Sequence, residues 1–156
     1  NSGVANNDTL EGYEIAAETF NRVGAQCKRE GLVFCYHNHA WEFKSFDGVK
    51  GIHRLIELTD PELVKLRVDV YWVTIGEEKP KDFIERYADR AIYYHFKDGA
   101  PGEFVELGQG QVDLPAAKAA AMACGPEWIV VEQDKTTKDP KVSAAESLAY
   151  LKTLGL

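Results

Sequence analysis

Apolar residues recur three or four positions apart along residues 8–30, which predicts one face of an α-helix. Asn7 or Asp8 is expected to cap the start of this helix, and Gly31 is expected to end it. The residues that follow, 32–36, read LVFCY and form a short apolar run rich in strand-forming side chains. This run predicts a buried β-strand directly after the first helix.

The same alternation of helix and strand repeats three more times. Further helices are predicted over residues 49–58, 80–88, 114–124 and 141–154, and further strands over residues 64–70, 91–96 and 128–133. Apolar strands separated by helices are typical of a parallel sheet covered by helices, so the predicted fold class is α/β. The Gly-rich segment 99–113 is predicted to be a long loop between a strand and a helix, so residues 1–156 form a single domain.

The composition fits a globular protein that acts on small molecules. Of the 156 residues, 45% are hydrophobic, and no apolar run approaches the roughly 20 residues that cross a bilayer, so we expect a soluble protein without a membrane partner. The 18 basic and 25 acidic residues give a formal net charge of −7 without a basic stripe, which disfavours nucleic acid as a partner. A cytoplasmic location is favoured, although any N-terminal leader would lie outside this sequence.

Several residues have a structural explanation and need no functional one. Cys27, Cys35 and Cys124 match no metal-binding or disulfide spacing, and they are predicted to be buried free thiols. His53 falls within a predicted helix and is expected at its surface. The Asp-Gly dipeptide at 47–48 is typical of a turn.

Each predicted strand ends in residues that a buried strand rarely contains. In chain order these are His37 and His39, then Asp69, then His95 with Lys97 and Asp98, and finally Glu132 with Asp134. Ligands bind outside the carboxyl ends of strands in parallel α/β folds, so these side chains are expected on one rim. Each residue alone has an ordinary explanation, such as a hydrogen-bonded histidine or a helix-capping aspartate. The recurrence at all four strands favours a shared binding site.

Alternation along the strands refines this prediction. His37 and His39 are expected to point the same way while Asn38 points the other way, and His95 and Lys97 are expected to share a face. Two carboxylates with one or two imidazoles predict a cage for Mn²⁺, Co²⁺ or Zn²⁺, because imidazole ligands argue against a pure preference for Mg²⁺ or Ca²⁺.

Aromatic residues also follow the strand ends. Trp41, Tyr71 and Trp72 either wall a sugar pocket or pack within the loops, and the sequence leaves both alternatives open.

An ordered set of motifs carries a resemblance to a known family. The motifs are YHNHAWEF (36–43), RVDVYWVTIGEEKPKDFIERYADR (67–90), YYHFKDG (93–99), ELGQGQVD (106–113) and WIVVEQD (128–134). Together they resemble the sugar phosphate isomerase/epimerase superfamily, whose fold is the (β/α)₈ TIM barrel of xylose isomerase. The match spans about residues 10–155, and the ordered set is far more specific than any single motif.

The resemblance implies one divalent metal at the C-terminal mouth of the barrel, with Mn, Co, Zn or Mg as the ion. By motif position the metal ligands would be His37, Asp69, His95 and Glu132. His37 stands where many relatives carry glutamate, so His37, His39 and Glu42 remain alternatives for the first ligand.

The chain is too short for the complete barrel that the resemblance implies. Relatives have eight strands in about 250 residues or more, whereas four strands are predicted here. The chain resembles the C-terminal half, strands five to eight, and four parallel strands leave two sheet edges open. We therefore expect a missing N-terminal half-barrel or a homo-oligomer to complete the structure.

The resemblance implies a metal-dependent isomerase or epimerase that acts on a sugar or keto-sugar through an enediolate. Glu132 is expected as metal ligand and base, and Lys97 is expected to hold a substrate oxygen or phosphate and to take part in catalysis. His39, Glu42 and Trp72 are predicted to contact the substrate. The alternatives are a metal-dependent sugar dehydratase or eliminase, a metal nuclease of the endonuclease-four type, and an inactive structural half.

Overall fold

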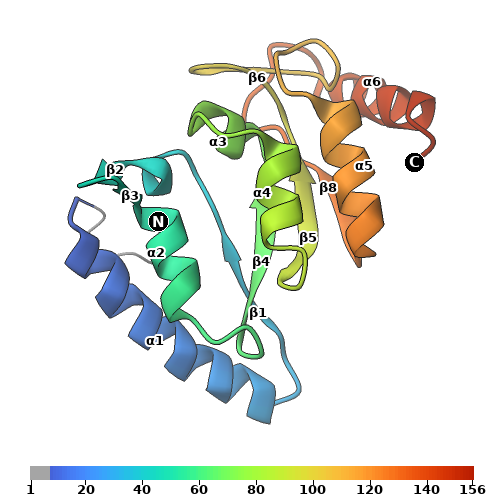
Figure 1. Ribbon diagram of the computed structural model, residues 1–156. Coiled ribbons are helices and arrows are strands. Elements are labelled where there is room, and N and C mark those ends of the chain that lie inside the picture. Colours follow the sequence, from blue (N-terminus) through green and yellow to red (C-terminus); the bar gives the residue numbers. More distant parts are fainter. Residues whose placement is uncertain (1–7) are drawn as a thin grey trace.

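Four parallel strands form the central sheet of the computed structural model, which describes residues 8–156 (Figure 1). The strands are β1 (Phe34–His37), β4 (Val64–Asp69), β5 (Ala91–Phe96) and β8 (Trp128–Val131), and they are hydrogen-bonded in that order. The predicted α/β class with a parallel sheet is confirmed. The first strand begins at Phe34 rather than at residue 32, because Leu32 and Val33 lie exposed before it.

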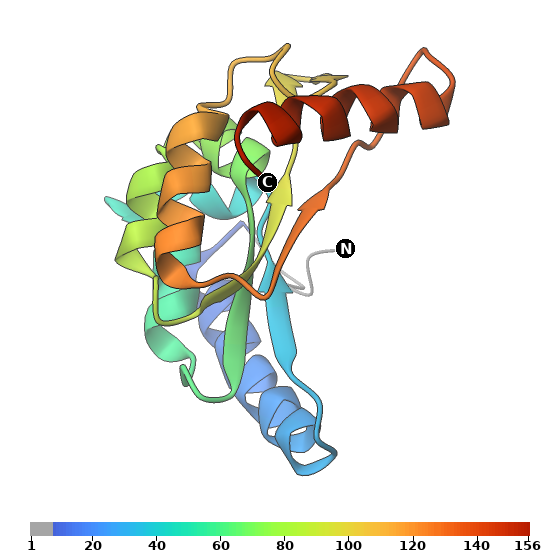
Figure 2. The same ribbon diagram turned by 90° about the vertical axis from the view of Figure 1, so that its right-hand side faces the viewer.

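The five predicted helices are all present. They are α1 (Leu10–Arg29), α2 (Gly51–Leu58), α4 (Pro80–Arg86), α5 (Leu114–Cys124) and α6 (Pro140–Thr153). Figure 2 shows α2, α4 and α5 on one side of the sheet, as expected for helices that connect parallel strands. None of the helices within residues 8–156 is long and apolar enough to cross a membrane.

The start of α1 differs by one residue from the prediction. Thr9, not Asp8, is the N-cap, because the Thr9 side chain accepts a hydrogen bond of 3.2 Å from the Gly12 backbone N–H. The alternative cap, Asn7, lies outside the described residues. The predicted end is confirmed, since α1 stops before Gly31, whose φ of +73° favours glycine.

Six short elements were missing from the sequence prediction. They are a 3₁₀ turn, η1 (Trp41–Phe43), helix α3 (Val70–Ile75), and two hairpins, β2–β3 (Ser45–Phe46 with Val49–Lys50) and β6–β7 (Asp98–Ala100 with Glu103–Val105). The Asp-Gly turn at 47–48 joins β2 to β3, and both residues have positive φ, as such turns require. Part of the predicted loop 99–113 is therefore a hairpin. Its strands have only three residues each, which is too short for a hydrophobic periodicity to predict them.

The two faces of the sheet have different environments. Side chains toward the helices form the core, where Val68, Tyr94 and Phe96 are fully buried. On the other face, Trp128 and Val130 remain 62% and 43% exposed. Neither edge strand, β1 or β8, pairs with a further strand among the described residues. The sheet is thus open, and the expected partner half-barrel or homo-oligomer stays a prediction.

Two structural predictions from the sequence need correction. The three cysteines are free, but each is partly exposed rather than buried. His53 is largely buried rather than on the surface, with 17% of its side chain exposed. Its ring bonds to the Tyr87 hydroxyl at 2.6 Å and to Glu78 Oε1 at 2.8 Å, and these contacts join α2 to the region of α4.

Asp98 organises the loop that contains the β6–β7 hairpin. Its carboxylate is 1% exposed and accepts four backbone hydrogen bonds: Oδ1 from Gly99 at 2.8 Å and Val112 at 3.1 Å, and Oδ2 from Gly108 at 2.9 Å and Gly110 at 3.1 Å. Charge-assisted bonds of this kind are stronger than neutral ones. Asp98 therefore holds the loop and does not join the rim of ligand-type side chains with which the sequence grouped it.

We expect Asp98→Asn to lower the free energy of unfolding by about 2–4 kcal/mol. The NH₂ group of the asparagine would replace one carboxylate oxygen, and the buried backbone N–H groups that bond to this oxygen would lose their acceptor. Urea titration measures this loss, and amide hydrogen exchange should accelerate at Gly108 and Val112. The matched variant Asp89→Asn changes an exposed aspartate and should stay within about 0.5 kcal/mol of the wild type. Equal stabilities for the two variants would contradict the role assigned to Asp98.

Candidate metal centre

The structure brings four of the predicted site residues together at the carboxyl ends of the strands. His37 and Asp69 end β1 and β4, His95 lies in β5, and Glu132 follows β8. Each offers one potential ligand atom, and these four atoms lie within 4.8 Å of one another. The grouping follows from the sheet order, because these four strands are direct neighbours.

The distances within this cluster suit a shared cation. His37 Nε2 lies 3.3 Å from Asp69 Oδ2 and 3.9 Å from Glu132 Oε2, and His95 Nδ1 is hydrogen-bonded to the same Glu132 oxygen. Ligand atoms that each lie about 2.1 Å from one ion are at most about 4.2 Å apart. Small side-chain shifts would therefore bring all four atoms into one coordination sphere. Two imidazoles and two carboxylates suit Mn²⁺, Co²⁺ or Zn²⁺.

Asp69 is held by the fold from both sides. It is fully buried, and its Oδ1 caps α3 by accepting hydrogen bonds from the backbone of Tyr71 at 3.0 Å and Trp72 at 3.1 Å. The Asn38 side chain donates to the Asp69 carbonyl at 3.2 Å and accepts from its N–H at 3.0 Å. These contacts leave Oδ2 directed at the cluster, where it faces His37.

Lys97 is a buried ammonium beside the cluster. It is 1% exposed, and Nζ lies 3.2 Å from Asp69 Oδ2, 3.1 Å from Asp134 Oδ2 and 3.5 Å from Glu132 Oε2. Burial alone would lower the pKa of Lys97, but the three carboxylates outweigh burial and raise it. In this arrangement Lys97 is therefore protonated at neutral pH and can donate hydrogen bonds.

Glu132 is ionised over the whole neutral range. The hydrogen bond from His95 is the largest effect on its pKa and, together with the charges of Lys97 and His37, lowers it to about 2 against the opposing effect of burial. In this arrangement Glu132 is a weak base, since effective general bases have pKa values near the working pH. The low pKa suits a metal ligand better than a proton acceptor.

Among the three alternatives for the first ligand, the structure brings only His37 into the cluster. Glu42 is fully buried, and its carboxylate accepts hydrogen bonds from the Tyr36 hydroxyl at 2.6 Å and the His39 backbone at 2.8 Å. The His39 ring stacks on Trp41 with centroids 4.1 Å apart, and it lies 4.8 Å from the His37 ring. Glu42 thus fixes the turn that carries His39.

Tyr71 and Trp72 lie in different environments. Tyr71 is fully buried and donates a hydrogen bond to the Ala100 carbonyl at 2.9 Å, so it packs within the loops. Trp72 meets Tyr71 and Phe104 edge-on, and the Lys97 ammonium lies 5.2 Å from the centre of the Trp72 ring. Trp72 therefore borders the cluster and also contributes to packing.

The chain is similar to several proteins that are named as sugar-converting enzymes. The chain is 28% identical to the inosose dehydratase of Geobacillus kaustophilus, over 91% of this chain and 53% of that protein. A sugar phosphate isomerase/epimerase from Parabacteroides distasonis superposes with a TM-score of 0.82 at 27% identity, over 92% of this chain and 53% of that one. The D-allulose 3-epimerase of a Methylomonas species shares the fold, with a TM-score of 0.69 at 19% identity. The match covers 94% of this chain and 57% of that one.

The chain spans about half the length of the curated relatives it matches, which agrees with an open sheet of four strands. The chain also covers about half the length of the similar solved structures. The family model described as the xylose isomerase-like TIM barrel matches residues 2–154, and the chain therefore belongs to that family.

Proposed function

We propose that this chain supplies the metal centre of an isomerase or epimerase that removes a proton next to the carbonyl of a sugar or keto-sugar. The observation that carries the proposal is the convergence of His37, Asp69, His95 and Glu132 at the mouth of the sheet. These side chains would hold the ion, which would act as a Lewis acid that polarises the substrate carbonyl. The proposal concerns the complete protein, because the chain spans about half of its relatives.

Lys97 is proposed to bind a substrate oxygen. Its ammonium is already charged and lies 3.5 Å from Glu132, so a substrate oxygen at the cluster would come within its reach. Negative charge that develops on this oxygen as the proton leaves the carbon would be stabilised by a nearby donor. This role requires the three carboxylates around Lys97 to keep it protonated.

Two groups are proposed to accept protons from the substrate. Glu132 is proposed to serve as metal ligand and as base in turn, and coordination of the ion by His95 and Glu132 would replace the hydrogen bond between them. A second base is proposed to come from the other half of the barrel. His39 and Trp72 are proposed to contact the substrate at the rim, and Glu42 to act through His39.

Dehydration of a keto-sugar is the second candidate, and the similarity to proteins named inosose dehydratases favours it. Both reactions begin with the same removal of a proton beside the carbonyl. Elimination follows when a hydroxyl group on the next carbon leaves as water. The cluster serves either outcome, so the distinction depends on the substrate and on the acid that protonates the leaving oxygen.

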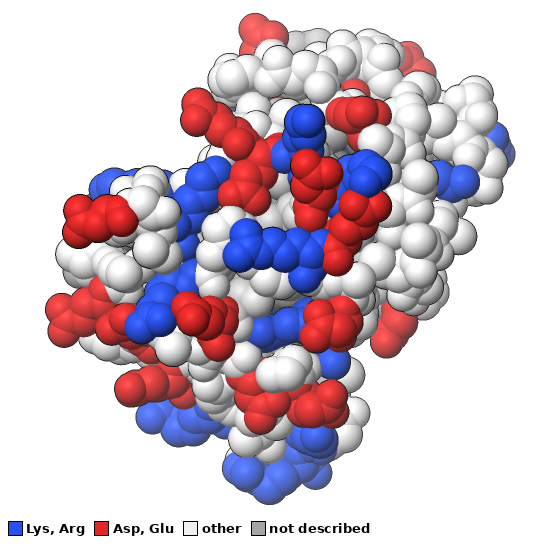
Figure 3. Space-filling model, in the orientation of Figure 1, with Lys and Arg blue, Asp and Glu red and all other residues white. Residues whose placement is uncertain are grey.

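A nuclease of the endonuclease-four type is disfavoured. Acidic and basic side chains interleave on the face drawn in Figure 3, without a continuous basic surface for phosphates. Within residues 8–156 a single cluster of metal-ligating side chains occurs, whereas a multi-metal site needs more ligands.

Metal content tests the cluster directly. Wild-type protein loaded with Mn²⁺ or Co²⁺ should retain about one ion per chain, and His37→Ala or Glu132→Ala should weaken binding at least about 100-fold, because each removes a ligand. Elemental analysis after dialysis measures retention. His53→Ala is the matched control, since this histidine bonds to Tyr87 and Glu78 on other elements. Undiminished metal in both cluster variants would refute the centre.

Solvent deuterium distinguishes the two reactions. The complete protein that contains this chain, incubated with keto-sugars in heavy water, should return sugar that carries deuterium on the carbon beside the carbonyl, without loss of water. Mass spectrometry and NMR of the recovered sugar measure this. A product that has lost water would establish the dehydratase instead, and neither change in any keto-sugar would count against proton abstraction at this site.

A further inference from the structure

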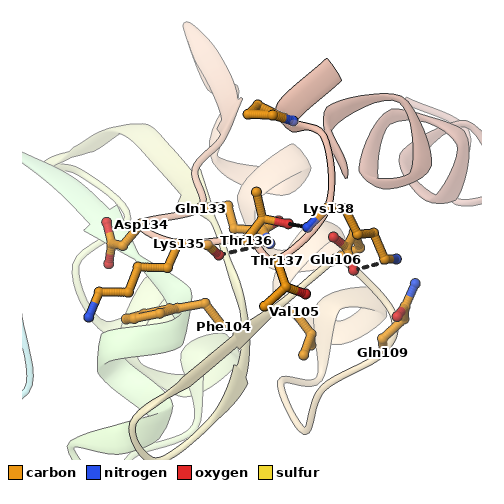
Figure 4. Close-up of a pocket in the computed structure, with 11 residues that line it drawn as sticks. Phe104, Val105, Glu106, Gln109, Gln133, Asp134, Lys135, Thr136, Thr137 and Lys138 are labelled. Carbon is orange, nitrogen blue, oxygen red and sulfur yellow. Dashed lines mark hydrogen bonds and ion pairs between the residues drawn. The ribbon is translucent and has the colours of Figure 1, made fainter. Parts of the chain in front are cut away.

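A second feature lies next to the metal centre: a groove with a volume of about 850 Å³ between β7 and residues 133–140. Its size falls within the range of roughly 300–1,000 Å³ that is typical of small-molecule sites. Figure 4 shows Phe104 and Asp134 at one end and Gln109 with Lys138 at the other, with Gln133 between them. The reaction proposed above does not use this groove.

One end of the groove reaches the metal centre. Asp134 lines the groove and binds Lys97 Nζ at 3.1 Å, and the same Nζ lies 5.7 Å from the centre of the Phe104 ring. Lys97 in turn lies 3.5 Å from Glu132 of the cluster. A molecule whose carbonyl lies at the cluster can therefore extend past Phe104 into the groove.

The lining suits a hydroxylated ring. Phe104 offers an aromatic surface, and Gln109, Gln133, Thr136 and Thr137 offer neutral donors and acceptors. Gln133 uses its N–H groups for the Lys135 carbonyl and the Glu106 carboxylate, and its oxygen accepts from the Ser143 hydroxyl, which leaves one acceptor site on its amide. An apolar ring face with neutral hydrogen-bonding groups around it is the combination that orients a polar ligand without a formal charge.

The charges around the groove disfavour an anionic ligand. Lys138 is already paired with Glu106 at 2.9 Å and with Glu146 at 2.6 Å. The nearby N-terminus of α6 is occupied by Asp139, whose carboxylate accepts from the Lys141 backbone at 2.8 Å. A phosphate would therefore meet capped or neutralised groups along most of the groove.

Lys135 is the remaining cation in the lining. Among the described residues it makes no ion pair, since Asp134 pairs with Lys97 and Glu106 pairs with Lys138. Two lysines and two carboxylates line the groove, so its formal charge is zero. This balance favours a neutral ligand.

We propose that the groove binds a second, neutral, polyhydroxylated ring joined to the ring whose carbonyl lies at the metal centre. The substrate class is then a glycoside of a keto-sugar rather than a free monosaccharide or a sugar phosphate. This inference rests on the proposed function for the position of the reacting ring, whereas binding of the second ring needs only the groove.

The test measures binding to the metal-free chain by saturation-transfer NMR, with glucose, glucose 6-phosphate, maltose, cellobiose and gentiobiose as probes. At least one disaccharide should bind about fivefold or more tightly than glucose, as one or two additional hydrogen bonds provide. Phe104→Leu and Thr137→Val should abolish this advantage. Phe46→Leu, a matched change in β2, should retain it, and circular dichroism verifies that each variant is folded.

The outcomes separate the groove from the metal centre. Glu132→Ala should lose the metal but keep the disaccharide advantage, because the groove does not need the ion. Undiminished metal in both His37→Ala and Glu132→Ala would refute the proposed metal centre and leave the groove assignment standing. The assignment is overturned if no disaccharide exceeds glucose, or if the advantage survives Phe104→Leu and Thr137→Val. It is also overturned if glucose 6-phosphate binds most tightly and Lys135→Ala removes that binding.

Discussion

The carboxylate of Asp69 joins the fold to the candidate metal centre. One oxygen caps α3, and the other faces His37 and Lys97 in the cluster. Because Asn38 binds both backbone groups of Asp69, the ends of β1 and β4 cannot shift independently. A side chain held in this way loses little further conformational freedom when it binds an ion, and such preorganisation favours a defined coordination geometry.

Lys97 compensates the negative charge of one buried and two partly exposed carboxylates. Asp69, Glu132 and Asp134 would repel one another, and the ammonium between them offsets that repulsion. A buried pair that loses one partner leaves an uncompensated charge, which is strongly destabilising. An ion at the cluster would take over part of this compensation and free Lys97 to interact with a substrate oxygen.

The sequence predicted the main elements and the shared rim because both follow from periodicity. Alternating helices and apolar strands predicted the parallel sheet, and ligand-type residues at each strand end predicted a shared rim. The narrower set of His37, Asp69, His95 and Glu132 came from the resemblance to the family.

Short elements and long-range contacts could not be predicted in the same way. Helix α3 has only six residues, and the β6–β7 hairpin depends on four backbone groups that converge on Asp98 from as far as Val112. Glu42 was expected near the substrate, yet it lies beneath His39, because the 3₁₀ turn that buries it has no periodic signal. Strand alternation alone could have separated Asp98 from the rim, because a residue that follows Lys97 points to the opposite side of the strand.

The open face of the sheet bears on what completes the barrel. Strand alternation places Lys65 and Arg67 on the face that also carries the exposed Trp128, and neither cation forms an ion pair with a described residue. Closure of the sheet would bury these charges, and buried charges require partners of opposite sign. A second copy of the chain would bring the same cations face to face, and like charges in an interface are unfavourable. Carboxylates opposite Arg67 on a half-barrel of different sequence would meet this requirement.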